Sequence, residues 1–141
     1  MLAVKITLLY VGKPRDPSAN QLAGEYARRI ARFCDFRMQQ VRGEESLARR
    51  ERAYRVVLDP GGRQLSSREF AAVIERAENA AVRELVFFVG GAEGVSESTR
   101  RQADLLLALS GLTLPHELAR VILSEQIYRA FTMLRHHPYA R

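Results

Sequence analysis

The sequence has 141 residues, the length of one domain, and 47% of them are hydrophobic, which is enough to bury a core. No apolar run approaches the roughly 18 residues of a membrane span. A single cysteine, Cys34, excludes an internal disulfide and fits a reducing cytoplasm. The formal net charge of +6 is carried almost entirely by arginine, and either a general arginine bias or a nucleic-acid partner accounts for it.

The hydrophobic pattern predicts five strands that alternate with five helices. The strands are short apolar or alternating runs, at 4–11, 36–41, 55–59, 85–89 and 109–116. The helices begin near capping residues such as Ser18, Ser66 and Ser96, and span about 18–33, 44–55, 66–81, 96–108 and 117–135. This alternation predicts one α/β domain, residues 1–141, with a mostly parallel sheet and helices on both faces.

Two glycine-containing loops follow predicted strands in the second half of the chain. The first is Gly90-Gly91-Ala92-Glu93-Gly94, which matches neither the dinucleotide-binding nor the P-loop pattern. On its own it would be a tight turn without a ligand. The second loop, around Gly111 and Pro115, comes one helix later. Because ligands bind at the carboxyl ends of strands in open α/β sheets, the pair of loops favours a binding site.

The histidines and the basic residues give weaker signals. His116, His136 and His137 have no common zinc spacing, so we expect no metal site. The arginines within 28–55 form either a solvated face or a surface that contacts RNA phosphates. The tail 136–141 is too polar for a core; it is either a frayed end or a clamp in which Tyr139 and Arg141 hold a nucleobase and a phosphate.

Several short segments resemble those of the ribosomal RNA large subunit methyltransferase H family, a small group within the SPOUT superfamily. The resemblance covers essentially the whole chain and is most specific in its last third. The matching segments are Leu8-Leu9-Tyr10-Val11-Gly12-Lys13, Val57-Leu58-Asp59, Val89-Gly90-Gly91-Ala92-Glu93-Gly94, Leu109-Ser110, Thr113-Leu114-Pro115-His116, Arg120-Val121, Glu125-Gln126-Ile127-Tyr128-Arg129-Ala130 and His137-Pro138-Tyr139.

The resemblance implies an α/β knot in which the C-terminal segment forms a trefoil. It implies a site for S-adenosylmethionine at Leu58, Gly90, Leu109, Ser110, Gly111, Leu112, Thr113 and Leu114. The implied activity is methylation of N3 of a pseudouridine in large-subunit ribosomal RNA, on assembled ribosomes in the cytoplasm. The implied assembly is a homodimer, and the last helix offers apolar residues for it at Val121, Ile122, Tyr128, Ala130 and Phe131.

The residues that assist the reaction are less well defined by the resemblance. Tyr139 and Arg141 are the first candidates, and His116 and His137 come behind them. Ala140 stands where relatives commonly carry histidine, so we assign the tail to RNA positioning before proton transfer. The alternatives are a SPOUT methyltransferase that acts on another RNA, such as a tRNA, and a non-catalytic ribosome-associated binding protein that has kept the fold.

Overall fold

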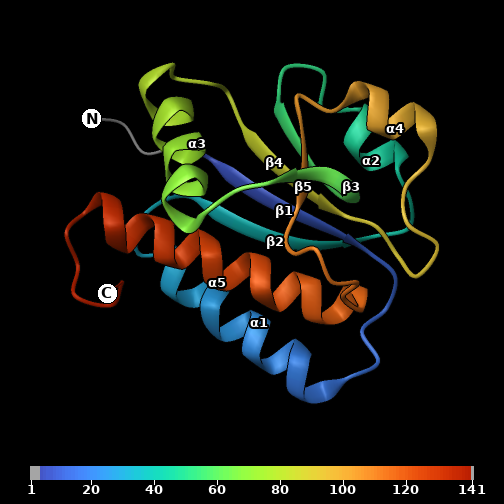
Figure 1. Cartoon of the computed structure of the whole chain (residues 1–141), viewed down its shortest axis with the longest axis horizontal. Helices are drawn as coiled ribbons and strands as arrows, with labels where there is room; N and C mark the ends of the chain where they lie inside the picture. Colours follow the sequence, from blue (N-terminus) through green and yellow to red (C-terminus); the bar gives the residue numbers. More distant parts are fainter. Residues whose placement is uncertain (1–3, 141) are drawn as a thin grey trace.

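The computed structural model describes residues 4–140, which form one five-stranded sheet flanked by helices (Figure 1). All strand pairs are parallel, in the order β2-β1-β4-β3-β5. The strands are β1 Ile6–Val11, β2 Phe36–Val41, β3 Tyr54–Gln64, β4 Leu85–Val89 and β5 Leu105–Ala108. The helices are α1 Pro17–Ile30, α2 Glu45–Ala48, α3 Ser67–Asn79, α4 Glu97–Gln102 and α5 His116–Leu134. The expected single α/β sheet with helices on both faces is therefore confirmed.

The central strands are buried on both faces because their side chains alternate between two apolar clusters. On β4, Phe87 packs into the cluster beneath α1, α3 and α5, whereas Phe88 packs into the cluster beneath α2 and α4. On β1, Leu8 and Leu9 divide in the same way. A strand that must be apolar on both faces reads as a continuous hydrophobic run, which is why Leu85–Val89 was recognisable from sequence.

The face covered by α1, α3 and α5 holds most of the core. Figure 1 shows α1 and α5 side by side along the sheet, with α3 next to α5. Fully buried Phe131 of α5 stacks on Phe33 with ring centroids 5.5 Å apart. Cys34 belongs to the same cluster, and burial raises the pKa of its thiol to about 12, so it stays protonated and packs as an apolar residue.

Two predicted elements between 96 and 116 are wrong. The helix that begins after Ser96 ends at Gln102 instead of Ala108, and the next strand is Leu105–Ala108 instead of 109–116. A short run such as Leu-Leu-Leu-Ala fits a buried strand as well as a helix, so periodicity does not distinguish them. In the folded chain, β3 offers this run a free edge, and pairing with that edge decides the outcome.

The first half of the chain also departs from expectation at three places. The charged helix predicted for 44–55 is the single turn α2, because Leu47 is the only buried residue that it contributes. Strand β3 does not end at Pro60 but continues to Gln64 after a register shift. Helix α1 is capped by Asp16, which accepts hydrogen bonds from the backbone N–H groups of Ser18 and Ala19, instead of by Ser18.

Three other expectations concern α3, α5 and the knot. The capping box of Ser66 and Glu69 is confirmed at the start of α3, and α5 begins and ends within one residue of its predicted bounds. Strand order does not establish how the chain threads, so the trefoil knot stays a prediction.

Within residues 4–140, no helix is both long and apolar enough to cross a membrane.

Candidate functional site

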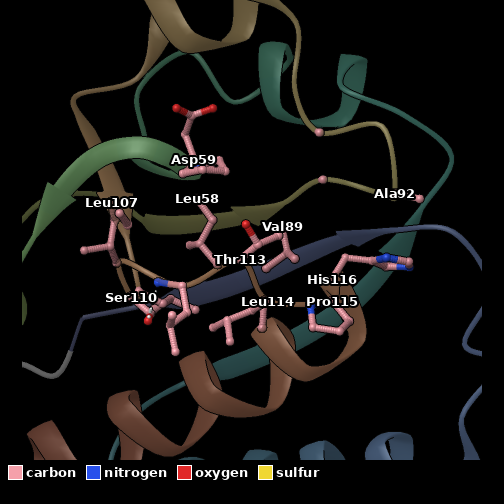
Figure 2. Close-up of a pocket in the computed structure, with 18 residues that line it drawn as sticks. Leu58, Asp59, Val89, Ala92, Leu107, Ser110, Thr113, Leu114, Pro115 and His116 are labelled. Carbon is pink, nitrogen blue, oxygen red and sulfur yellow. Dashed lines mark hydrogen bonds between the residues drawn. The ribbon is translucent and has the colours of Figure 1, made fainter.

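A cavity of about 590 Å³ lies at the carboxyl ends of three neighbouring strands. Its walls are residues 58–60 of β3, the glycine loop after β4, the end of β5 with the loop that follows, and the first turn of α5 (Figure 2). The volume is within the range of small-molecule sites, about 300–1,000 Å³. Its position, outside the carboxyl ends of parallel strands, is where open α/β sheets bind ligands.

Seven of the eight residues that the resemblance assigned to the cofactor line this cavity. They are Leu58, Gly90, Leu109, Ser110, Leu112, Thr113 and Leu114. The eighth, Gly111, belongs to the same loop but does not line the cavity, and a side chain there would approach Gln64. Figure 2 shows that Leu58, Val89, Thr113 and Leu114 converge on one space from separate strands and loops. Their assignment as cofactor ligands stays a prediction.

The glycine loop is closed on itself so tightly that Gly90 has no room for a side chain. Gly91 and Gly94 form an isolated antiparallel bridge, and Gly94 has φ +78°. A Cβ atom added to Gly90 would lie 2.9 Å from the carbonyl oxygen of Gly94 and 3.0 Å from Cγ1 of Val95. The absence of side chains therefore lets the loop fold back on itself and leaves its backbone exposed to the cavity.

The glycine loop is tied to α2 through Glu44. The Glu44 carboxylate accepts hydrogen bonds from the backbone N–H of Ser96, at 2.8 Å, from its hydroxyl, at 2.5 Å, and from the Thr99 hydroxyl. Burial acts to raise the pKa of Glu44, but these hydrogen bonds outweigh it and lower the pKa below its ordinary value. Since Ser96 caps α4 and lies two residues after the loop, Glu44 holds the loop's C-terminal end in place.

A second carboxylate, Asp59, is part of the cavity wall and lies within β3, where the register of the strand shifts. It is 8% exposed, accepts a hydrogen bond from the Gly61 backbone N–H and pairs with Arg100 of α4 at 3.5 Å. In Figure 2 its carboxylate points away from Thr113 and Leu114. Asp59 thus joins the β3 wall to α4. Sequence reasoning did not assign it a role, although it directly follows Leu58, because its partner lies 41 positions along the chain (100 − 59 = 41).

His116 begins α5, and among the candidate catalytic residues that the structure describes it alone lines the cavity. In Figure 2 its ring lies beside Pro115, near the glycine-loop residue Ala92. Helix α5 has 19 residues, so its first N–H groups present a partial positive charge towards the cavity. Such an end attracts a carboxylate or another anion.

The C-terminal tail lies far from the cavity within the same chain. Tyr139 packs edge-on against Tyr128, with ring centroids 4.6 Å apart, and its hydroxyl donates to Glu125 at 2.8 Å. Tyr128 is twelve residues beyond His116 on α5 (128 − 116 = 12), which is about 18 Å along the helix axis. The structure thus separates Tyr139 and His137 from the cavity, and Arg141 lies outside the described residues. Their catalytic assignment stays a prediction.

Comparison with known families places the chain in one of them. A family model described as "Predicted SPOUT methyltransferase" matches residues 4–140. The chain belongs to the SPOUT methyltransferase family. A ribosomal RNA large subunit methyltransferase H from Solibacter usitatus is 44% identical over 140 residues, which cover 98% of this SPOUT chain and 100% of the relative. The family expected from the sequence is therefore confirmed.

Solved SPOUT-like structures show the same fold at low sequence identity. A probable methyltransferase from Bordetella pertussis superposes with a TM-score of 0.60 at 12% identity and covers 90% of this chain and 96% of its own. The SpoU methyltransferase AviRb from Streptomyces viridochromogenes, solved in complex with the cofactor AdoMet, gives a TM-score of 0.53 at 13% identity. That match covers 92% of this chain and 58% of AviRb.

Proposed function

We propose that this SPOUT chain transfers a methyl group from S-adenosylmethionine to N3 of a pseudouridine in large-subunit ribosomal RNA. The target is the assembled ribosome in the cytoplasm. One observation carries the proposal: a single cavity at the carboxyl ends of β3, β4 and β5 is lined by seven of the eight residues matched to the family's cofactor motif. The 44% identity to a relative that bears this enzyme name supports the same activity.

The residues present fit S-adenosylmethionine. The apolar side chains of Leu58, Leu109 and Leu114 suit the adenine ring, and the exposed backbone around Gly90 offers polar groups for its edge. The first turn of α5 suits the carboxylate of the methionine part. Bound there, the cofactor supplies a methyl group on a positively charged sulfur, and the protein's task is to hold the acceptor nitrogen in line with it.

The acceptor N3–H must lose its proton before or during the attack. Tyr139 is poorly suited to take that proton in the conformation seen here, because burial and its hydrogen bonds with Tyr26 and Glu125 raise the pKa of its phenol. A protonated phenol donates hydrogen bonds and stacks on bases. We therefore assign Tyr139, together with Arg141, to positioning the RNA.

We also propose a homodimer, with a contact surface that differs from the one expected on α5. Val121, Tyr128, Ala130 and Phe131 are buried within the chain, so they do not supply that surface. Among the large apolar residues that the structure describes, Leu22 of α1 with Leu118 and Ile122 of α5 are exposed on this layer, at 42%, 46% and 36%. Pairing through this patch would cover it and would give the tail of one subunit access to the cavity of the other.

The proposal is tested by incubating the protein and labelled S-adenosylmethionine with two substrates. Ribosomes from a strain that lacks the gene should accept the label, and free tRNA should not. Mass spectrometry of the large-subunit RNA should then locate the methyl group on a pseudouridine. Label in tRNA alone would favour a different RNA target, and failure to bind S-adenosylmethionine in calorimetry would favour the non-catalytic alternative.

A further inference from the structure

Three exposed cations stand at the carboxyl edge of β1 and β2, beside the cavity. Lys13 and Arg15 belong to the loop after β1, and Arg42 directly follows β2. The two strands pair in register up to Val11 and Val41, and the Gly12 N–H donates to the Val41 carbonyl at 3.2 Å. The loops therefore lie side by side, and we name these three residues the basic rim.

The basic rim is unpaired because its neighbouring carboxylates bind other groups. Within residues 4–140, the side chains of Lys13, Arg15 and Arg42 form no hydrogen bond or ion pair with another residue. Asp16 caps α1, and Glu117 accepts the backbone N–H groups of Arg15 and Asp16 at 2.9 and 3.0 Å. Carboxylates that accept neutral donors leave the three cationic groups free to meet an anion from outside.

The loop that carries Lys13 and Arg15 is held in one conformation. Gly12 has φ +94°, a left-handed conformation that favours glycine and turns the chain out of β1. The hydrogen bonds from the backbone N–H groups of Asp16 and Arg15 lower the pKa of Glu117. This carboxylate is therefore ionised at neutral pH and continues to accept both hydrogen bonds from the loop. A fixed loop loses little conformational entropy when its cations bind an anion.

A second positive group lies directly beneath the rim. Arg120 of α5 is only 3% exposed, stacks over Tyr10 at 4.0 Å and donates to the Asn20 amide oxygen at 2.7 Å. In the described part of the chain it forms no salt bridge, and its charge contributes to the lowered pKa of the nearby Glu117 carboxylate. It lines a small second cavity together with Lys13 and His116. This cavity shares Val89, Gly90 and His116 with the larger one, so the two open next to each other.

Three of the other unpaired arginines, Arg28, Arg32 and Arg52, lie at the opposite edge of the sheet. Arg28 and Arg32 are at the end of α1, which runs back from the carboxyl edge towards the start of β2. Arg52 precedes the start of β3, near Arg50, whose guanidinium pairs with Glu84 just before β4. Because all strands are parallel, their starts share one edge and the cavity lies at the other. Within one chain, these arginines are not placed to hold RNA at the cavity.

We propose that the basic rim, Lys13, Arg15 and Arg42, binds RNA phosphates next to the methylated nucleotide, with Arg120 placing a buried positive charge beside the acceptor base. The inference rests on the proposed function, since it takes the large cavity as the cofactor site. Phosphate contacts fix the position of the RNA, and the shared wall at Gly90 brings the base and the cofactor together. The sequence-based expectation placed RNA contacts among the arginines of 28–55, and only Arg42 of that set is retained.

The test compares two triple variants with the same loss of charge. The rim variant is Lys13→Gln/Arg15→Gln/Arg42→Gln, and the control variant is Arg28→Gln/Arg32→Gln/Arg52→Gln; all six side chains are exposed. The rim variant should lower kcat/KM on ribosomes more than tenfold, and it should flatten the plot of log RNA affinity against log salt by about 2. The control should change kcat/KM less than threefold. A charge-preserving variant, Lys13→Arg/Arg15→Lys/Arg42→Lys, should retain most of the activity.

Equal losses in the rim and control variants would overturn the inference, because they would show a general charge effect. An unchanged rim variant would overturn it as well. Calorimetry with S-adenosylmethionine should give the same affinity for all variants. If the wild-type protein neither binds this cofactor nor methylates RNA, the proposed function fails. Filter binding of large-subunit RNA would then still decide whether the rim, and not the control set, carries RNA affinity.

Discussion

The two faces of the sheet are stabilised in different ways. The α1, α3 and α5 face uses three long helices and a large apolar cluster that includes Phe87, Phe131 and Ile127. The α2 and α4 face uses helices of four and six residues and a cluster built on Leu9, Leu47, Val57, Val86 and Phe88. There, the Glu44 carboxylate links α2 to the start of α4, and the Asp59 carboxylate links β3 to α4.

This difference explains where the cavity lies. We call the face covered by α1, α3 and α5 the large face and the face covered by α2 and α4 the small face. The cavity lies at the carboxyl edge of the sheet, between elements of both faces. Helix α5 of the large face supplies one wall, and the glycine loop, which Glu44 ties to the small face, supplies another. The large face gives the site a firm base, because closely packed side chains resist displacement. The small face holds the loop by a few polar contacts, which separate more easily than a packed core.

The largest effect is expected from shortening a side chain of the large face. Phe131→Ala should lower the free energy of unfolding by about 3–5 kcal/mol, because the fully buried ring leaves a cavity and loses its stack on Phe33. Leu47→Ala on the small face should cost about 2 kcal/mol, at the low end of the range for buried leucine. Urea unfolding of both variants measures the difference, and equal costs would contradict the comparison of the two faces.

Removal of the tail should separate methylation from cofactor binding. Deleting residues 139–141 takes away the ring that packs on Tyr128, and neither Tyr139 nor Ala140 lines the cavity. We expect methylation of ribosomes to fall by about 100-fold, or about 2.7 kcal/mol in the barrier. Affinity for S-adenosylmethionine in calorimetry should stay within twofold.

The variant Tyr139→Phe is the control, since it keeps the ring and removes only the hydroxyl that donates to Glu125. It should retain more methylation than the deletion. Full activity of the deleted protein would show that the tail is dispensable. Loss of cofactor binding along with activity would mean that the tail supports the structure around the cavity.

Replacing Gly90 of the glycine loop by alanine should weaken cofactor binding by about tenfold. Gly90→Ala places a Cβ atom 2.9 Å from the Gly94 carbonyl oxygen, so the loop must shift. Gly24→Ala is the matched control: its Cβ would have only the Arg28 guanidinium nearby, at 3.9 Å, and helical alanine should stabilise the protein by about 0.5–1 kcal/mol. Calorimetry should show lost affinity for the first variant alone. Equal affinities of the two variants would contradict the assignment of the glycine loop to the cofactor site.

The smallest effect is expected from Glu44→Gln, and it depends on pH. A folded-state pKa below the ordinary 4.5 means that Glu44 stabilises the protein above that pH, and that this contribution is lost as the pH falls through the lowered pKa. The variant should be about 1 kcal/mol less stable at pH 7, since an amide cannot accept all three hydrogen bonds. In acid the two proteins should converge. A constant difference across pH would show that Glu44 does not act through its charge.

The sequence predicts the elements whose signals are local. Strand β4 and the long helix α5 each carry their own apolar pattern, and the start of α3 carries a capping box. The predicted positions of these features were therefore accurate. Leu105–Ala108 was misassigned because its strand conformation depends on β3, a partner that lies 41 or more positions earlier. The charged segment 44–55 is a good helix former without an apolar face, and α2 therefore ends after one turn.

The candidate site shows the same division between local and distant information. Gly90 and the loop 109–114 were identified from short motifs, and the structure brings all but Gly111 to one cavity. The links of Asp59 to Arg100 and of Glu44 to Ser96 join residues far apart in the sequence, and no motif marks them. Tyr139 was expected in a polar, exposed tail, yet the fold half-buries it against Tyr128.

The order of the cavity walls along the chain has a consequence for protein synthesis. The walls come from residues 58–60, 89–94 and 107–119, so the cavity can form only after the first turn of α5 has been synthesised. A nascent chain without α5 has no complete site, whereas the finished protein gains stability from any ligand that binds only its folded form. Adding S-adenosylmethionine should therefore raise the melting temperature of the full chain. It should not change the melting temperature of a truncated chain that lacks α5.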